Sequence, residues 1–263
     1  YTDNYMTEGY LTRLQYDYKD KYFLSLSYRR DASSRFAPGH RWGDFGSLGL
    51  AWEMKKESFL QDVSWIDLLK LKVSYGVQGN DNVGSGDHPY YPYADLYSAS
   101  YNSETGNYSL VLTQKGNEEL TWETSKAFNV GVDFNLFHNR LNGTIEYFNR
   151  KTEDLLYNKP LPLSSGIVTG RYPMNVGAVR NTGIEVNLDG VIVKTKDISW
   201  SLNLNLTHYK NKILELEPSV AENGIKGSYY IYTVGGSLYE SYMYKYAGVD
   251  KETGKALYLK KVL

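Results

Sequence analysis

The sequence contains no cysteine, so it can build neither a disulfide framework nor a thiolate metal site. No run approaches the roughly 18 consecutive apolar residues that a membrane-spanning helix needs, and mean hydropathy is only −0.49. Acidic and basic residues almost cancel, giving a net charge of −1, so we expect no nucleic-acid partner. The opening residues 1–4 lack the basic start and apolar core of a signal peptide, and we expect a fragment of a longer protein.

Aromatic residues, in contrast, are abundant. They make up 15% of the 263 residues, and 26 of them are tyrosine. A transmembrane β-barrel combines low hydropathy with many aromatic residues, because only alternate residues face lipid and aromatic girdles mark both membrane interfaces. The composition therefore favours an all-β protein of this kind.

Strict alternation of apolar and polar residues is the main pattern along the chain. It marks eight segments, at 10–18, 22–29, 47–53, 70–78, 128–134, 141–147, 184–188 and 200–207. Successive side chains of a strand point to opposite sides, so each segment has one apolar and one polar face. The apolar faces include Leu24, Val130, Ile145 and Leu204. These four residues would lie in a compact core if the protein were a soluble two-layer sandwich.

Two details favour the barrel over a soluble sheet, which shows the same alternation. The polar faces are rich in small neutral residues, and aromatic residues such as Tyr22, Tyr28, Phe134 and Trp200 lie near the ends of the apolar faces. Charged residues on the polar faces are then predicted to line the lumen. They are Arg13, Arg29, Lys72, Glu123, Glu146 and Glu185.

The connections alternate between short and long. Short ones are expected at 20–21, 137–140 and 194–197, and long ones at 31–40, 80–119, 151–180 and 211–237. Outer-membrane barrels sort their connections in this way, with short periplasmic turns and long extracellular loops. Residues 57–69 are an exception on the short side, where apolar residues at helical spacing predict a short amphipathic helix or a locally packed cap.

Two further regions leave alternatives open. Residues 238–263 are either two more barrel strands or a hairpin within an extracellular loop, with a turn at 250–254. The loop around 88–97 is rich in aromatic and polar groups, notably Tyr90, Tyr91, Tyr93, Asp95 and Tyr97. It could contact a glycan, contact a lid protein, or order itself by packing its own rings.

No pattern of catalytic residues is present. The four histidines stand alone, and no nucleophile elbow or phosphate loop occurs. Residues in two turns could in principle bind calcium through oxygen ligands, but the pattern favours solvated turns; they are Asp81, Asn82, Asp87, Asp250, Glu252 and Gly254. We predict no enzymatic activity, no metal site and no cofactor.

Longer motifs carry a resemblance to a known family. The segments that carry it, in chain order, are Arg29–Phe36, Arg41–Gly43, Leu69–Asn80, Leu120–Thr124, Arg140–Gly143, Thr152–Leu156 and Asn175–Glu185. Together they resemble the SusC/RagA family of TonB-dependent outer-membrane transporters, and the resemblance runs through nearly the whole chain.

The resemblance implies that residues 1–263 are part of one outer-membrane β-barrel domain whose plug and terminal strands are absent from this chain. The pattern itself indicates about 8–10 strands in this chain, part of a larger barrel. It implies import of oligosaccharides or similar large nutrients. Expected partners are a SusD-like surface lipoprotein, the TonB complex through segments not present here, a glycan or peptide substrate and the lipid membrane. The alternatives are a soluble β-rich carbohydrate-binding or adhesion module and a passive porin. Alone, this stretch is expected not to form an inserted barrel, because plugged transporters have about 22 strands.

Overall fold

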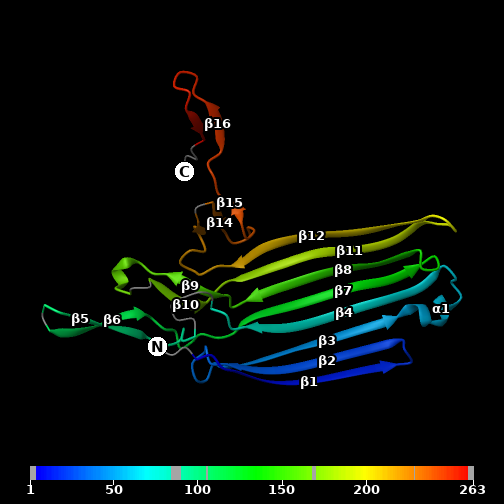
Figure 1. The fold of residues 1–263 in the computed structure, drawn as a ribbon, viewed down its shortest axis with the longest axis horizontal. Coiled ribbons are helices and arrows are strands. Elements are labelled where there is room, and N and C mark those ends of the chain that lie inside the picture. Colours follow the sequence, from blue (N-terminus) through cyan, green and yellow to red (C-terminus); the bar gives the residue numbers. More distant parts are fainter. Residues whose placement is uncertain (1–3, 84–89, 105, 168–169, 228, 260–263) are drawn as a thin grey trace.

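The computed structural model describes residues 4–83, 90–104, 106–167, 170–227 and 229–259. Eight antiparallel strands form one sheet in the order β1-β2-β3-β4-β7-β8-β11-β12 (Figure 1). Their bounds are β1 Thr7–Tyr18, β2 Tyr22–Ser33, β3 Trp42–Glu53, β4 Ile66–Asn80, β7 Glu123–Leu136, β8 Leu141–Glu153, β11 Ala178–Lys194 and β12 Ser199–Glu215. All eight segments predicted from alternation are therefore confirmed as strands.

The two ends of the sheet differ in their connections, as the loop lengths predict. Tight turns join β1 to β2, β7 to β8 and β11 to β12 at one end, which we call the turn end (Figure 1). In the first turn, Lys19 and Asp20 both take positive φ angles, of 55° and 49°, as a type I′ hairpin requires. The opposite loop end carries the small sheets β5–β6 (Leu96–Asn102, Asn107–Gln114) and β9–β10 (Leu156–Pro160, Arg171–Asn175).

The predicted helix at 57–69 is mostly wrong. The 3-10 turn η1 (Met54–Lys56) is followed by the helix α1, which covers only Ser58–Gln61, and β4 begins at Ile66. Leu69, which the helical spacing included, lies opposite Phe134 of β7. Residues 66 and 69 would lie on opposite faces of a regular strand, but an irregularity in the register between Ile66 and Leu68 places them opposite Leu136 and Phe134, on one face.

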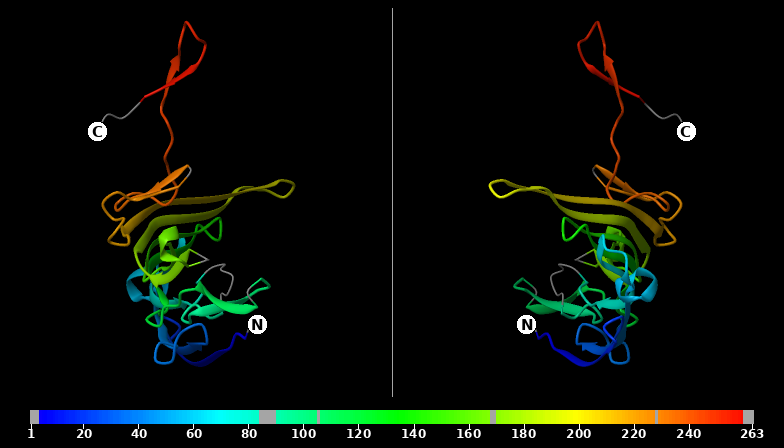
Figure 2. Two further views of the ribbon diagram at one scale, coloured as in Figure 1. Left: turned by 90° about the vertical axis from the view of Figure 1, so that its left-hand side faces the viewer. Right: turned by 90° about the vertical axis from the view of Figure 1, so that its right-hand side faces the viewer.

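The segment after β12 leaves the eight-stranded sheet. It contains a small sheet of β13 (Ile225–Lys226), β14 (Tyr230–Tyr232) and β15 (Glu240–Ser241), and then a hairpin of β16 (Tyr246–Val249) and β17 (Ala256–Tyr258). Figures 1 and 2 show this hairpin standing away from the sheet. The predicted turn at 250–254 is confirmed, and within the described residues neither of its strands pairs with the main sheet.

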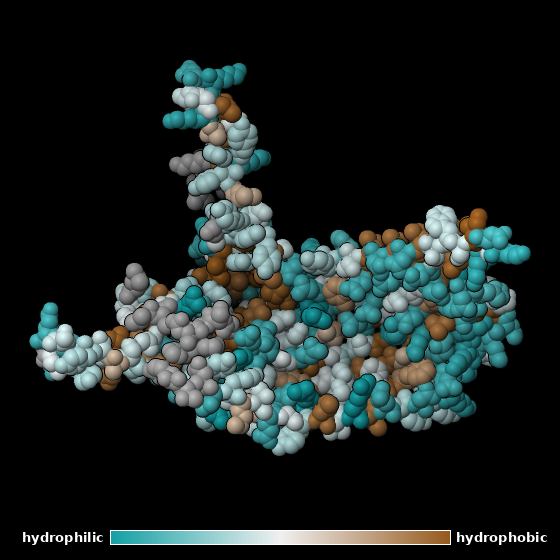
Figure 3. Space-filling model, in the orientation of Figure 1, coloured by the Kyte–Doolittle hydropathy of each residue, from teal (hydrophilic) through white to brown (hydrophobic). Residues whose placement is uncertain are grey.

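The sheet has no compact core beneath it. The accessible surface is 18243 Å², whereas a compact monomer of this mass would expose about 11700 Å². Ile145 is 46% exposed and Leu204 50% exposed, and Leu24 and Val130 are only half-buried. Apolar residues reach the surface of the strand region among hydrophilic ones (Figure 3). The soluble two-layer sandwich is therefore excluded.

Only small clusters are buried. Among the described residues, the buried apolar side chains are Phe36, Ala37, Ile66, Val83, Leu120, Ala178, Val179 and Ile213. Most of them lie at the loop end or at the ends of strands, where loops cover the sheet. No helix among the described residues is long and apolar enough to span a membrane. The sheet is open, with β1 and β12 as its two edge strands.

Candidate functional site

The strand register gathers the charged residues predicted to line a lumen on one face of the sheet, which we call the polar face. They are Arg13, Arg29, Lys72, Glu123, Glu146 and Glu185. Glu146 lies directly opposite Glu185 on one side and Gly131 on the other, and Gly131 lies opposite Lys72. Residues opposite one another in a sheet share a face. Lys72, Glu146 and Glu185 therefore form one row across β4, β7, β8 and β11, with Gly131 between the first two.

Glycine makes room within this row. A Cβ at Gly131 would lie 3.3 Å from both Cβ and Cγ of Glu146, so the Glu146 side chain leans over the glycine. Lys72 Nζ is 2.7 Å from a carboxylate oxygen of Asp133, one row closer to the turn end. The side chains of both partners are more than a quarter exposed, and the charges of the row remain open to a solute.

Two hollows open on the polar face. The first has a volume of about 630 Å³, and its polar lining includes Gln15, Asp17, Ser25, Lys72, Asn129 and Glu146. The second, of about 570 Å³, lies nearer the loop end, and its lining includes Glu8, Arg29, Asp31, Gln78, Asp81 and Trp122. Both volumes are in the range of small-molecule sites, but they are open depressions of a wall that bears mixed charge.

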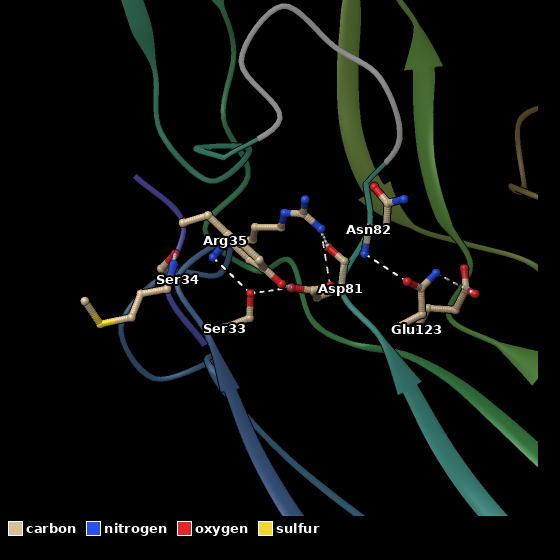
Figure 4. Close-up of polar contacts among 9 residues, drawn as sticks. Ser33, Ser34, Arg35, Asp81, Asn82 and Glu123 are labelled. Carbon is tan, nitrogen blue, oxygen red and sulfur yellow. Dashed lines mark hydrogen bonds and ion pairs between the residues drawn. The ribbon is translucent and has the colours of Figure 1, made fainter. Parts of the chain in front are cut away.

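A buried ion pair marks the loop end of the second hollow. Arg35 Nη1 is 3.2 Å from Asp81 Oδ1, and the two side chains are 14% and 15% exposed. Ser33 Oγ donates to the other carboxylate oxygen at 2.6 Å, and Tyr5 donates to it at 2.8 Å. Figure 4 shows how Ser33, at the end of β2, and Arg35, in the loop after it, meet Asp81 just after β4. The pair joins segments that are 46 residues apart.

Aromatic rings enclose the same guanidinium. Arg35 lies 4.5 Å from the ring centroid of Tyr5 and 5.7 Å from that of Tyr90. Burial and the hydrogen bond to Asp81 raise the pKa of the Tyr5 hydroxyl. We call Tyr5, Ser33, Arg35, Asp81 and Tyr90 the Arg35 cluster. It ties the entry of β1 to the two loops that follow β2 and β4.

A small apolar core supports the Arg35 cluster. Phe36 and Leu120 are fully buried against Val83, and Trp122 packs on them. Trp122 also donates from Nε1 to the carbonyl of Arg41 at 3.0 Å. Motifs that are distant in the sequence therefore converge at this end of the sheet.

Amide and carboxylate side chains join a further loop to this core. Asn175 accepts from the Thr121 amide at 2.8 Å and donates to the Thr121 carbonyl at 2.8 Å. Glu123 accepts from Asn80 at 3.2 Å and from the backbone of Leu156 at 3.1 Å. Glu123, on the polar face, thus binds loop residues as well; Figure 4 shows its contact with the Asn80 segment.

The predicted aromatic loop divides into two parts. The ring centroids of Tyr90 and Tyr5 are 5.9 Å apart. The Tyr91 hydroxyl accepts a hydrogen bond from the backbone N–H of Asn4 at 3.1 Å. Tyr93 is half-buried. Tyr97 is 50% exposed, at the start of the β5–β6 hairpin. The aromatic loop continues to Tyr101 and Tyr108 at the tip of that hairpin, and these two rings are 57% and 75% exposed.

Asp95 holds the base of this hairpin. It accepts from Lys115 at 2.7 Å and from the Gly116 amide at 2.8 Å. The hydrogen bond from Lys115, followed by that from Gly116, holds the pKa of Asp95 below its usual value. The carboxylate is thus committed to internal contacts.

The carboxylates considered as possible calcium ligands form hydrogen bonds within the protein. Asp81 is the acceptor of the Arg35 cluster, and Asp250 accepts from the amides of Glu252 and Thr253. Asp87 and His88 lie outside the described residues. Among the residues that are described, no three histidine or acidic side chains gather as a metal site.

The sequence did not indicate that Arg35 is the residue around which this cluster forms. Its position in Arg29–Phe36 was visible as part of a family motif, but its partner Asp81 is 46 residues away. Only the pairing of β2, β3 and β4 brings the two together.

A family model matches almost the whole chain. The family is described as TonB dependent receptor-like, beta-barrel, and the match covers residues 2–252. The chain is 36% identical over 239 residues to TonB-dependent receptor P39 of Formosa agariphila, covering 90% of the chain and 22% of that protein. It is 33% identical over 219 residues to TonB-dependent receptor SusC of Bacteroides thetaiotaomicron, covering 79% and 21%. The chain thus spans about a fifth of the length of these relatives.

Solved structures agree with the sequence matches. The RagAB peptide importer in its closed-closed state superposes with a TM-score of 0.85 and 30% identity, over 97% of this chain and 27% of that one. The FrpB iron transporter of Neisseria meningitidis superposes with a TM-score of 0.52 at 14% identity, over 82% of this chain and 27% of that one, which indicates a shared fold alone.

Proposed function

This chain belongs to the TonB-dependent receptor-like β-barrel family, and from that membership we propose that it forms part of the wall and outer loops of a nutrient importer. Proteins of this family are β-barrels of the bacterial outer membrane, and the chain is assigned to that membrane. The proposed activity is TonB-dependent import of oligosaccharides or similar large nutrients.

The two-faced sheet is the observation that carries this proposal. One face exposes apolar residues such as Ile145, Ile184 and Leu204, each about half exposed, which is unfavourable in water but suits hydrocarbon. The other face bears mixed charges and two hollows. A wall between lipid and an aqueous lumen needs this division.

The polar face supports a role in shaping the solute path. We propose that Arg13, Arg29, Lys72, Glu123, Glu146 and Glu185 face the lumen, and that residues 1–263 lie within one barrel domain. The open hollows, with charges of both signs, suit an extended polar solute better than a small enclosed one. The structurally similar RagAB is described as a peptide importer, so we consider peptides as well as glycans as candidate substrates.

Partners are proposed for the two ends of the barrel. At the loop end, the exposed rings of the β5–β6 hairpin support contact with a SusD-like surface lipoprotein or with substrate. Tyr and Trp are favoured at such interfaces because a large apolar ring comes with a polar group. TonB would act through segments of the full-length protein outside these residues. We propose no enzymatic step.

Fractionation and uptake test the main proposal. The full-length protein should be extracted from outer membranes only with detergent, and its deletion should abolish growth on its nutrient while simple sugars still support growth. Energy dependence separates the importer from a passive porin, because uptake through an importer should cease when TonB is removed. Ready solubility of the full-length protein would instead favour a soluble binding module.

Replacement of loop tyrosines tests the partner contacts. Changing Tyr97, Tyr101 and Tyr108 to alanine should weaken lipoprotein association or uptake, whereas changing Tyr90, Tyr91 and Tyr93 should also loosen the loop. Tyr244→Ala is a matched control, since this ring is 84% exposed in the segment between β15 and β16, outside the aromatic loop. Unchanged association and uptake in both triple variants would leave the rings with a packing role only.

A further inference from the structure

Four basic residues stand side by side across four neighbouring strands. Lys126 of β7 lies opposite Lys151 of β8, Lys151 lies opposite Arg180 of β11, and Arg180 lies opposite Lys212 of β12. We call these four residues the basic row. Like charges directly opposite one another destabilise a sheet, so the row calls for a counter-charge.

The basic row lies on the apolar face of the sheet. On β7, the residues of the same face that follow Lys126 toward the turn end are all apolar: Phe128, Val130, Val132, Phe134 and Leu136. At 3.4 Å per residue this run is about 27 Å long, and a strand tilt near 40° shortens it to about 20 Å across the membrane. On β7 the row therefore begins where the hydrocarbon ends, whereas on β12 two polar residues of the same face, Lys210 and His208, lie between Lys212 and Leu206.

The protein supplies only part of the counter-charge. Glu153 forms ion pairs with Lys126 and Lys151. Arg180 and Lys212 are exposed, and among the described residues neither has an ion-pair partner. Lys210, one row nearer the hydrocarbon, adds another exposed cation. Glu215, at the end of β12, forms no ion pair with them.

The same row is neutral on the other flank of the sheet. Continued across β4, β3, β2 and β1, it consists of Val77, Gly46, Tyr28 and Thr12. The arginine nearest to that part, Arg30, is 3.7 Å from Asp44 and lies 5.2 Å from the ring centroid of Trp42. Along this row, the basic residues without an ion-pair partner among the described residues are therefore those of β11 and β12.

We propose that Arg180 and Lys212, together with Lys126 and Lys151, bind the phosphate headgroup of an anionic lipid in the outer leaflet. This inference rests on the proposed placement of the sheet in the outer membrane. Four neighbouring strands span about 14 Å, which is enough for one or two phosphate groups. Arginine forms paired hydrogen bonds with phosphate and lysine supplies a point charge.

The residues below the row complete the lipid site. Ile184 and Leu206 are 49% and 58% exposed, on β11 and β12. They lie on the same face as Arg180 and Lys212, toward the turn end, and the polar residues Thr182, Lys210 and His208 lie between them and the row. Acyl chains would cover them while the headgroup neutralises the cations. A free anion would leave these apolar side chains uncovered, and the combination therefore favours a lipid over soluble phosphate.

The experiment uses the full-length protein in nanodiscs of phosphatidylcholine doped with a phosphorylated glycolipid. Bound glycolipid is counted by native mass spectrometry. The double variant R180Q/K212Q should retain at least tenfold less glycolipid than the wild type, and R180K alone should retain it. R30Q is the matched control and should behave as the wild type, because Arg30 already has Asp44 as its partner.

Several outcomes would overturn the proposal. They are equal retention by R180Q/K212Q and the wild type, equal retention of a dephosphorylated glycolipid, and displacement by inorganic phosphate at the concentration of the lipid. Loss of a co-purifying protein without loss of glycolipid would assign the row to a protein partner instead. Heat-modifiable migration on gels checks that each variant is folded. Failure to fractionate with outer membranes would refute the proposed function itself, independently of lipid counting.

Discussion

The two ends of the sheet are built in different ways. At the turn end, three of the four connections are tight turns, as where Lys19 and Asp20 close a hairpin. Glu57, in the fourth connection, binds its near neighbour Trp52 at 3.2 Å and Tyr22, 35 residues away, at 2.6 Å. At the loop end, contacts join segments 46 to 87 residues apart, as between Arg35 and Asp81 or Asn4 and Tyr91. Short turns form from local geometry, whereas the loop end needs the whole sheet in place.

This difference has a functional consequence. A surface built from distant segments can present a fixed platform to a partner or solute, because each loop is held by the others. At the turn end, three of the four connections close from local geometry. We therefore expect substitutions at the loop end to cost more stability, and the predictions below test that expectation from the largest effect to the smallest.

Leu120→Ala should have the largest effect. Leu120 is fully buried between Phe36 and Val83, and emptying such a site costs about 3 kcal/mol. Denaturant unfolding of the full-length protein, with hydrogen exchange at the loop end, measures the loss. The control is Leu202→Ala, since Leu202 is 55% exposed on the apolar face. Equal effects of the two substitutions would contradict the distinction between loop end and wall.

Asp81→Asn should rank second. It removes the charge that accepts from Arg35, Ser33 and Tyr5. Because the asparagine side chain keeps one oxygen as an acceptor, we expect a net loss of about 2 kcal/mol. Because Asp81 helps to raise the pKa of Tyr5, the substitution should also move that pKa down toward its usual value. A spectroscopic titration of the Tyr5 hydroxyl measures this change in pKa. Asp20→Asn, at the turn end, should change neither quantity appreciably.

Glu57→Gln should have a smaller, pH-dependent effect at the turn end. Hydrogen bonds from Tyr22, Trp52 and Lys21 hold the pKa of Glu57 below its usual 4.5. Its stabilising contribution is therefore complete above pH 4.5 and is lost as pH falls through the lowered folded-state pKa. Glu57→Gln should flatten the acid dependence of stability in that window. An unchanged acid profile in the variant would show that Glu57 does not stabilise this end.

Tyr108→Ala should have the least effect on stability. The ring is 75% exposed at the tip of the β5–β6 hairpin and contacts Tyr101 at a centroid distance of 5.0 Å. Surface substitutions of this kind change stability by less than about 0.5 kcal/mol. A thermal unfolding scan of the full-length protein is sufficient to measure it. A loss as large as that of Leu120→Ala would mean that the hairpin tip is packed.

Alternation was enough to predict the wall. Once each strand and its polar face were known, antiparallel pairing placed Arg13, Lys72 and Glu146 on one face without further information. The short and long connections likewise sorted themselves to opposite ends. A period of two is a strong local signal, and pairing carries it across the sheet.

Local patterns could not predict the rest. The spacing of Ile66 and Leu69 fitted a helix better than a regular strand, and the pairing of β4 with β7, with an irregular register between Ile66 and Leu68, made it a strand. The Arg35 cluster depends on residues whose proximity follows from tertiary structure alone. The hydrogen bond between Asp95 and Lys115 could not be predicted from the sequence, because the pairing of β5 with β6 brings these two residues together.

The open edges of the sheet restrict how a barrel can be completed. Eight strands alternate in direction, so β1 and β12 run opposite ways along the two margins. Hydrocarbon does not tolerate the unpaired amides and carbonyls of such margins. A ring in which every neighbour is antiparallel has an even total of strands, and so the remainder that closes this one must also contribute an even number.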